Sequence, residues 1–124
     1  MKRKQFVKGV NQIAQEGAIQ IFQEHEAGYA EIIVGVVGTL QFDVLKFRLK
    51  NEYGCDIRLE PLPYESIRWI KDKETDMNKL KGVSEVKKVR DMKGNPLLLF
   101  KNEWSIRFVL ERNEGLELIE FDRD

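Results

Sequence analysis

Residues 29–70 read YAEIIVGVVGTLQFDVLKFRLKNEYGCDIRLEPLPYESIRWI, and this stretch contains the changes of pattern that decide the fold. An apolar run over 31–37 predicts a strand that is covered on both faces. A glycine and a threonine interrupt the run, and Thr39 is placed to cap a helix over 40–53. Residues 55–60 then alternate apolar and charged side chains, which predicts a second strand with one face in water.

The helix predicted over 40–53 has two apolar stripes, whereas a simple surface helix has one. At about 100° per residue, the two nearly opposite stripes are Leu40, Val44 and Phe47, and Phe42, Leu45, Leu49 and Tyr53. One stripe should cover the sheet. The other needs a second cover, which is either the C-terminal half of the chain or a part absent from this sequence. We expect the C-terminal half to cover Phe42, Leu45 and Leu49.

The segments around this stretch complete the order helix, strand, strand, helix, strand. A helix is predicted over 4–16 because its apolar residues form one stripe, and Gly17 is placed to end it. Further strands are predicted over 18–23 and 64–71. Helices on one face of a small sheet make a two-layer α+β unit, which we assign to residues 1–71.

Residues 72–124 are predicted to extend this unit into one compact domain. The polar stretch 71–82 is the expected boundary between the two parts. The predicted elements beyond it are strands over 83–90, 96–101 and 116–121 and a helix over 103–113. Asn102 is placed to cap this helix. Its core face should contain Trp104, Phe108 and either Val109 or Leu110.

Composition argues against several classes of protein. Lysine plus arginine and aspartate plus glutamate both number 21, a balance unlike that of a dedicated nucleic-acid module. Cys55 is the only cysteine, so no disulfide framework or thiolate metal site is available. No apolar run approaches the roughly 18 residues of a membrane span. We therefore expect a cytoplasmic, reducing location and no contact with a membrane.

The sequence contains no group of residues typical of catalysis. Gly35 and Gly38 precede a helix, but the lysine of a phosphate-binding loop is missing, which favours a tight strand-to-helix turn. His25 is the only histidine, and in the loop predicted over 24–28 it has no oriented partner for acid–base chemistry. We predict no catalytic residue, no metal site and no cofactor in this chain.

Several blocks of the sequence resemble the C-terminal region of the bacterial peptide chain release factor 3 family. They read KQFVKGVNQIAQEGAIQIF at 4–22, IIVGVVGTLQFDVLKFRLKNEYG at 32–54 and DIRLEPLPYESIRWI at 56–70. The third domain of elongation factor G is more distantly similar, with a strand, a Gly-x-Leu turn and a helix in the same order. The resemblance extends to about residue 71 and rests on order and spacing.

The resemblance implies a non-catalytic, ribosome-docking domain cut from a longer translation factor. The family is GTP-dependent and promotes the departure of class I release factors from the ribosome during termination. GTP or GDP and magnesium would bind in a missing domain of the parent. The implied partners are ribosomal RNA, ribosomal protein, and the GTPase and second domains of the parent.

Basic residues are the candidates for contact with the ribosome, through phosphate contacts that position a protein without reading bases. The candidates are Lys46, Lys50, Arg58 and Arg68. A solvated face of mixed charge is the alternative for most of them. Two other functions remain open. One is the equivalent domain of another ribosomal GTPase, such as elongation factor G or a ribosomal protection protein. The other is a small α+β protein-interaction module.

Overall fold

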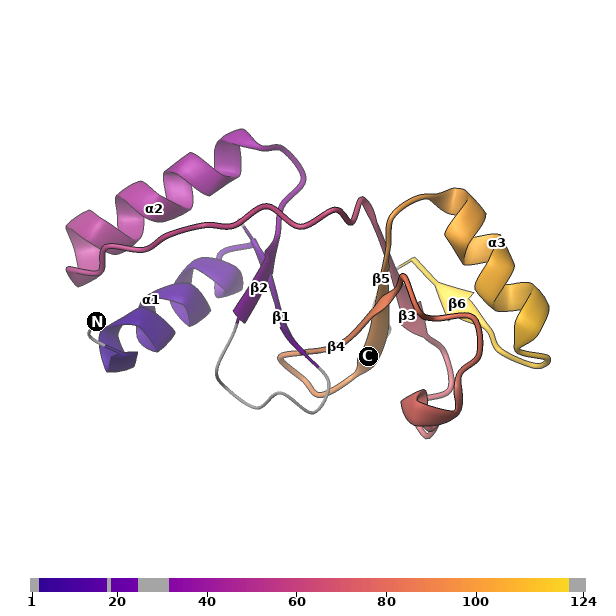
Figure 1. The fold of residues 1–124 in the computed structure, drawn as a ribbon. Helices are drawn as coiled ribbons and strands as arrows, with labels where there is room; N and C mark the ends of the chain where they lie inside the picture. The colour runs from indigo at the N-terminus through magenta and orange to yellow at the C-terminus, as the bar shows by residue number, and fades with distance from the viewer. Residues whose placement is uncertain (1–2, 18, 25–31, 121–124) are drawn as a thin grey trace. The chain divides into compact units, whose positions relative to one another are not determined.

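The computed structural model describes residues 3–17, 19–24 and 32–120. In chain order the elements are α1 (Arg3–Gln15), β1 (Gln20–Glu24), β2 (Ile32–Gly35), α2 (Leu40–Tyr53), β3 (Ser66–Ile70), the 3-10 helix η1 (Met77–Lys79), β4 (Lys87–Asp91), β5 (Pro96–Phe100), α3 (Glu103–Arg112) and β6 (Leu118–Ile119) (Figure 1). The predicted α+β class is confirmed.

The chain divides into two compact units, each built from segments that are separate in sequence. The first comprises Met1–Phe22 and Ile32–Pro61, and the second comprises Gln23–Glu31 and Leu62–Asp124. The division at residue 61 differs from the boundary that we predicted in the polar stretch 71–82. The predicted packing of the C-terminal extension on the first part stays a prediction.

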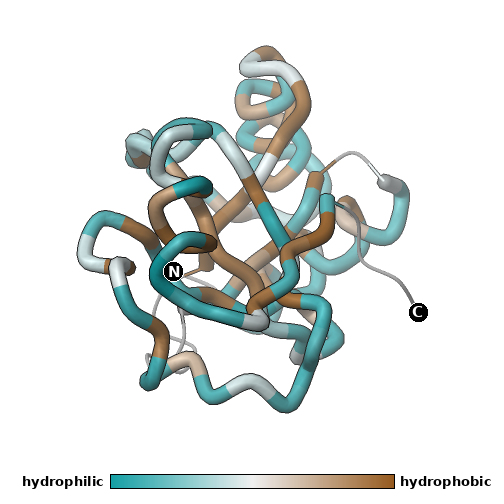
Figure 2. The backbone as a smooth tube through the Cα atoms, turned by 90° about the vertical axis from the view of Figure 1, so that its right-hand side faces the viewer, coloured by the Kyte–Doolittle hydropathy of each residue, from teal (hydrophilic) through white to brown (hydrophobic). Residues whose placement is uncertain are grey.

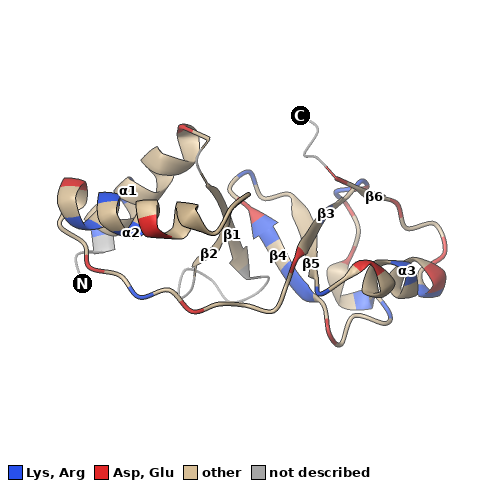
Figure 3. Ribbon diagram, turned by 90° about the horizontal axis from the view of Figure 1, so that it is seen from above, with Lys and Arg blue, Asp and Glu red and all other residues tan. Residues whose placement is uncertain are grey.

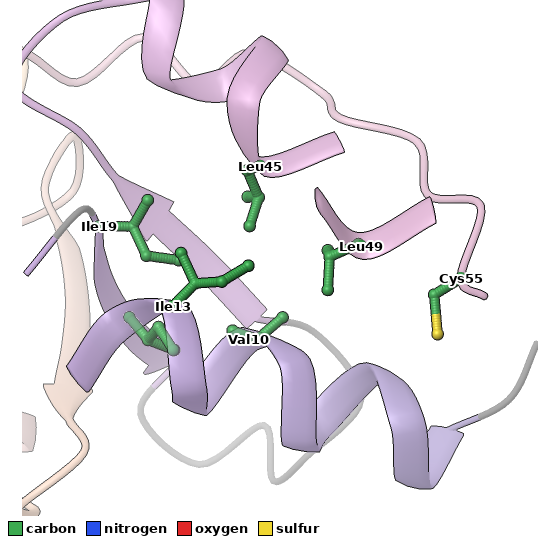
Figure 4. Close-up of a cluster of buried hydrophobic side chains, with 7 residues drawn as sticks. Val10, Ile13, Ile19, Leu45, Leu49 and Cys55 are labelled. Atoms are coloured by element: carbon green, nitrogen blue, oxygen red, sulfur yellow. The ribbon is translucent and has the colours of Figure 1, made fainter. Parts of the chain in front are cut away.

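In the first unit, α1 and α2 pack their apolar faces together and cover the strands. The buried cluster consists of Val10, Ile13, Ile19, Ile21, Leu45, Leu49 and Cys55. Leu45 and Leu49 point from α2 towards the side of α1 that carries Val10 and Ile13 (Figure 4). The stripe of α2 that contains Leu45 and Leu49 is therefore covered within its own unit. The prediction that the C-terminal half covers Leu45 and Leu49 is wrong, because α1 supplies a matching apolar face. For Phe42, which is half-buried, it stays a prediction.

Gly9 lies on the face of α1 that packs against α2. A Cβ atom at position 9 would lie 2.7 Å from Cδ2 of Leu49 and 2.8 Å from Cδ2 of Tyr53. Glycine inside a helix costs about 1 kcal/mol relative to alanine. The close contact with α2 explains why a residue without a side chain occupies this position.

The predicted bounds of the helix over 40–53 are confirmed, but its start differs from the expectation. Thr39 has helical backbone angles, and its side chain makes no capping hydrogen bond. A turn replaces the cap, in which the amide of Gln41 donates to the carbonyl of Gly38 at 3.0 Å. At the other end, Gly54 takes a left-handed conformation with φ of 67°, and its amide donates to the carbonyl of Leu49.

The strand predicted over 55–60 is absent from this described segment. Burial does alternate along it, since Cys55 is buried whereas Asp56 and Arg58 are exposed. The period of two reports which side chains face the core, but it does not supply a neighbouring strand with which the backbone can pair. The prediction of β structure is wrong here for that reason.

In the second unit, α3 covers one face of strands ordered β4-β5-β3-β6. β5 pairs antiparallel with β4 through Val89 and Leu97, and with β3 through Arg68 and Leu98. Every residue of β5 is buried. The core beneath α3 consists of Ile70, Met77, Val86, Leu98, Phe100 and Val109. Because Met77 of η1 belongs to this core, the stretch 71–82 is part of the second unit.

The remaining predicted elements differ from the structure mainly at their ends. The strands predicted over 18–23, 31–37, 64–71, 83–90, 96–101 and 116–121 correspond to β1, β2, β3, β4, β5 and β6. β2 is only half-buried along its length, so the prediction of a strand covered on both faces is wrong. His25, the rest of the predicted loop from 25 to 28, and Phe121 lie outside the described residues.

The predicted cap of α3 is confirmed. Oδ1 of Asn102 accepts a hydrogen bond from the amide of Ser105 at 2.9 Å. Of the residues assigned to the core face, Val109 is fully buried and Phe108 is half-buried. Trp104 is 69% exposed, so its assignment to the core is wrong.

Replacing Asn102 with alanine should lower the free energy of unfolding by about 1 kcal/mol, because an amide at the start of α3 loses its acceptor. Urea denaturation followed by far-UV circular dichroism measures this change. Asn102→Asp is the matched control, since a carboxylate also accepts from the amide of Ser105 and should retain most of the stability. Equal losses in both variants would contradict the capping role.

Hydrophobic and hydrophilic residues are interspersed along the backbone (Figure 2). Among the described residues, no helix has the length and apolar character needed to cross a membrane.

Candidate interaction surfaces

The outward face of α2 carries a row of exposed apolar side chains, which we call the α2 outer stripe: Leu40, Val44 and Phe47. Their exposed fractions are 72%, 41% and 66%. On the helix they lie nearly opposite the buried Leu45 and Leu49. Several large apolar side chains exposed side by side are typical of a surface that binds another molecule.

Two lysines lie along one flank of the α2 outer stripe. Lys46 and Lys50 are both exposed and are one helical turn apart, so their ammonium groups share one side of the helix. Figure 3 marks the lysine and arginine residues on the helices. The structure thus brings together two of the four predicted contact residues, next to apolar side chains that the sequence had already placed on the same helix.

An arginine on the opposite flank of α2 forms an ion pair with Glu16, in the turn that follows α1. Nη2 of Arg48 donates to Oε2 of Glu16 at 2.9 Å, and Nε of Arg48 donates to Oε2 of Glu52 at 2.8 Å. The hydrogen bonds with Glu52 and Glu16 raise the pKa of Arg48 above its usual value, and the bond with Arg48 lowers the pKa of Glu52. Arg48 is therefore a link between helices, which makes it less available to a partner.

The other two predicted contact residues lie apart from this pair. Arg58 is exposed in the extended segment of the first unit. Arg68 belongs to β3 in the second unit, where Nη1 donates to the carbonyl of Ile67 at 2.8 Å. Nη2 of Arg68 also lies 3.5 Å from Oε1 of Glu120, and the side chain is only 21% exposed. The guanidinium of Arg68 is engaged within its own unit.

Surface hollows lie in two places among the described residues of the second unit. The larger, of about 750 Å³, is open and lies between the segments 71–81 and 112–117. Its charges are mixed, and Lys71 pairs with Glu117 at 3.0 Å across it. The smaller, of about 230 Å³, lies beside Trp104 and Phe108 of α3. Neither its existence nor the exposure of Trp104 was predicted from the sequence.

A signal for the exposure of Trp104 was present in the sequence. Trp104, Phe108 and Arg112 recur at helical spacing, so all three share one side of α3. An arginine in that row favours a face in contact with water. The apolar residue that faces the core, Val109, lies on a different side of the helix.

Within the described part of the chain, no group of three or more histidine, cysteine, aspartate or glutamate residues could hold a metal ion. Exposed large apolar side chains lie on α2 (Leu40, Val44 and Phe47) and on α3 (Trp104 and Leu110).

A family model described as "Class II release factor RF3, C-terminal domain" matches residues 1–110. The chain belongs to this family. The release factor RF3 family match includes all of α2 and the first turns of α3. It confirms the resemblance seen in the sequence, and it decides against both another ribosomal GTPase and an unrelated interaction module.

Relatives named peptide chain release factor 3 align with nearly the whole chain. The protein of Symbiobacterium thermophilum is 41% identical over 116 residues, and that of Acaryochloris marina is 43% identical over 117 residues; each alignment covers 94% of this chain. The protein of Lactobacillus acidophilus is 40% identical over 120 residues, or 97% of this chain. The chain spans only about 22% of the length of these release factor 3 relatives.

Proposed function

We propose that this chain is the ribosome-docking domain of a peptide chain release factor 3 and that it is not itself an enzyme. In the parent protein, GTP or GDP and magnesium would bind in another domain. The parent would promote the departure of class I release factors during translation termination in the cytoplasm. Membership in the RF3 C-terminal domain family supports this proposal.

The observation that carries the proposal is the combination on α2 of the α2 outer stripe with Lys46 and Lys50. Exposed lysines suit RNA phosphates, which they contact without reading base sequence. Exposed apolar side chains such as Phe47, which is 66% exposed, suit a protein surface. A particle made of RNA and protein presents both kinds of surface. Arg58 is assigned to the same docking function, whereas Arg68 contributes less because its guanidinium is engaged.

The inner side of α2 is built to hold this face in place. Leu45 and Leu49 are buried against α1, Gly9 permits a close approach, and Arg48 links the two helices. A helix fixed in this way moves with its unit as a rigid body. The domain would therefore transmit changes of position in the parent to the ribosome without rearranging its own contact face.

The test is cosedimentation of the full 124-residue chain with bacterial 70S ribosomes over a range of salt concentrations. Binding should weaken steeply as salt rises, because phosphate contacts release counterions. Reversing both charges in Lys46→Glu with Lys50→Glu should weaken binding at low salt. It should also reduce the salt slope by about one for each lost phosphate contact.

The matched control reverses two exposed lysines at the same spacing on α1, Lys4→Glu with Lys8→Glu. This pair changes the net charge equally but leaves α2 intact, so binding should stay close to that of the unchanged chain. Equal weakening by both pairs would show that overall charge, rather than the face of α2, governs binding. Absence of binding at low salt would contradict docking by this domain.

A further inference from the structure

Three side chains on α3 form a stacked row, which we call the α3 column: Trp104, Phe108 and Arg112. The ring centroids of Trp104 and Phe108 are 5.5 Å apart with an interplanar angle of 19°. Cζ of Arg112 lies 4.1 Å from the centroid of Phe108. Phe108 is therefore in contact with both the guanidinium of Arg112 and the ring of Trp104.

The neighbouring loop fixes the inner end of the α3 column. A Cβ atom at Gly82 would lie 2.9 Å from Cδ of Arg112 and 3.0 Å from Cε2 of Phe108, so the loop backbone packs directly on both side chains. The side chain of Asn113 links this loop to the end of α3 through two hydrogen bonds. Its Oδ1 accepts from the amide of Lys81 at 2.8 Å, and its Nδ2 donates to the carbonyl of Lys81 at 2.8 Å. Because these side chains are already held in place, the α3 column loses little conformational entropy when it binds a partner.

The outer end of the α3 column is open. Trp104 is 69% exposed and borders the hollow of about 230 Å³. Small-molecule sites usually have about 300 to 1,000 Å³, so this hollow suits a single side chain of a larger partner. Ser84, Glu85 and Ser105 contribute the polar part of its lining.

The charge of the hollow favours a cation over an anion. Glu85 is the charged residue in its lining, and its side chain is 73% exposed. Its carboxylate forms a long ion pair, in which Oε1 of Glu85 lies 3.9 Å from Nζ of Lys101. A carboxylate beside an exposed indole is complementary to a guanidinium, which stacks on aromatic faces and pairs with carboxylates. RNA phosphates would be repelled by the same carboxylate.

We propose that the α3 column is a docking site for an arginine side chain in a basic segment of a partner protein. The guanidinium of the partner stacks on the exposed face of Trp104 and pairs with the carboxylate of Glu85. Arg112 already makes the equivalent contact within the chain, at the far side of Phe108. The partner's arginine adds a cation–ring contact on Trp104 like the one that Arg112 makes on Phe108. This site lies in the second unit and does not depend on the contacts proposed for α2.

The test is a titration of the full 124-residue chain with the peptide acetyl-Gly-Arg-Gly-Arg-Gly-amide, followed by NMR. The indole N–H of Trp104 should shift on titration, and Trp104→Phe assigns its signal. A peptide with citrulline in place of arginine has the same shape without the charge, and it should bind about tenfold more weakly. Followed through the backbone amide of Glu85, Trp104→Ala should weaken binding of the arginine peptide about two- to fivefold, and Glu85→Gln, followed through the indole N–H, should also weaken it several-fold.

Leu62→Ala is the control, because Leu62 is 46% exposed and belongs to neither the α3 column nor the α2 outer stripe, so its truncation should leave binding unchanged. The unshifted spectrum of the remaining residues verifies that Trp104→Ala is folded. Equal binding of the arginine and citrulline peptides would overturn the proposal. Tighter binding of oligouridine than of the arginine peptide at Trp104 would also overturn it, because the site would then be a base-stacking platform.

Discussion

Replacing Phe100 with alanine should lower the free energy of unfolding by about 3 to 5 kcal/mol. Phe100 is fully buried at the end of β5, in the core that contains Leu98 and Val109. The loss has two parts: the transfer free energy of the buried ring, which is no longer gained, and the cost of the cavity that the ring leaves. β5 is paired on both edges, with β3 and β4, so its backbone has little room to move into that cavity.

Urea denaturation followed by tryptophan fluorescence measures this loss. Trp69 is a suitable reporter because it is only 7% exposed and lies on β3, next to β5. Leu62→Ala is the matched control, since Leu62 is 46% exposed and its truncation should change the free energy of unfolding by less than about 0.5 kcal/mol. A loss below about 1 kcal/mol for Phe100→Ala would contradict the tight packing beneath α3.

The second large effect should come from Gly9→Val, which we expect to lower the free energy of unfolding by about 2 kcal/mol or more. Helix propensity alone predicts a gain of several tenths of a kcal/mol, because glycine is a poor helix former. The Cβ atom of valine would, however, lie 2.7 Å from Cδ2 of Leu49. Leu49 is fully buried, so α1 and α2 must shift, and overpacking of this kind typically costs 1 to 3 kcal/mol.

Far-UV circular dichroism during urea denaturation measures this loss, since α1 and α2 contribute much of the helix signal. Gly38→Val is the matched control. No atom outside its chain neighbours lies within 4 Å of a Cβ built at Gly38, so the same substitution should have little effect there. A gain of stability in Gly9→Val would show that the two helices separate at no cost, and would contradict the close packing around Gly9.

Elements with both a clear period and clear ends were predictable from the sequence. α2 was predicted with its observed bounds, and the cap of α3 at Asn102 was identified from residue type alone. Where only the period was available, the prediction was weaker. Residues 55–60 have the alternation of a strand without a strand to pair with. The alternation shows which side chains are buried. A β-strand also requires a neighbouring strand with which its backbone can pair, and a single sequence does not reveal that neighbour.

Some features of the candidate surfaces were likewise predictable from the sequence, and others were not. The exposure of Lys46 and Lys50 followed from their place in a polar strip between the two apolar stripes of α2. Arg68 was predicted to face water, but its ion pair with Glu120 joins segments far apart in the sequence, and that contact was not foreseeable. Trp104 was assigned to the core because of its apolar character. Its stacking on Phe108 provides an alternative to burial that composition does not indicate.

The single cysteine of the chain has a practical consequence. Cys55 is only 2% exposed and belongs to the buried cluster of the first unit. A thiol-reactive reagent therefore modifies it only when this part of the chain opens. When modification is faster than reclosing, its rate in the absence of denaturant equals the rate at which the packing around Cys55 opens. The rate of Cys55 modification therefore reports on opening within the unit that contains the α2 outer stripe.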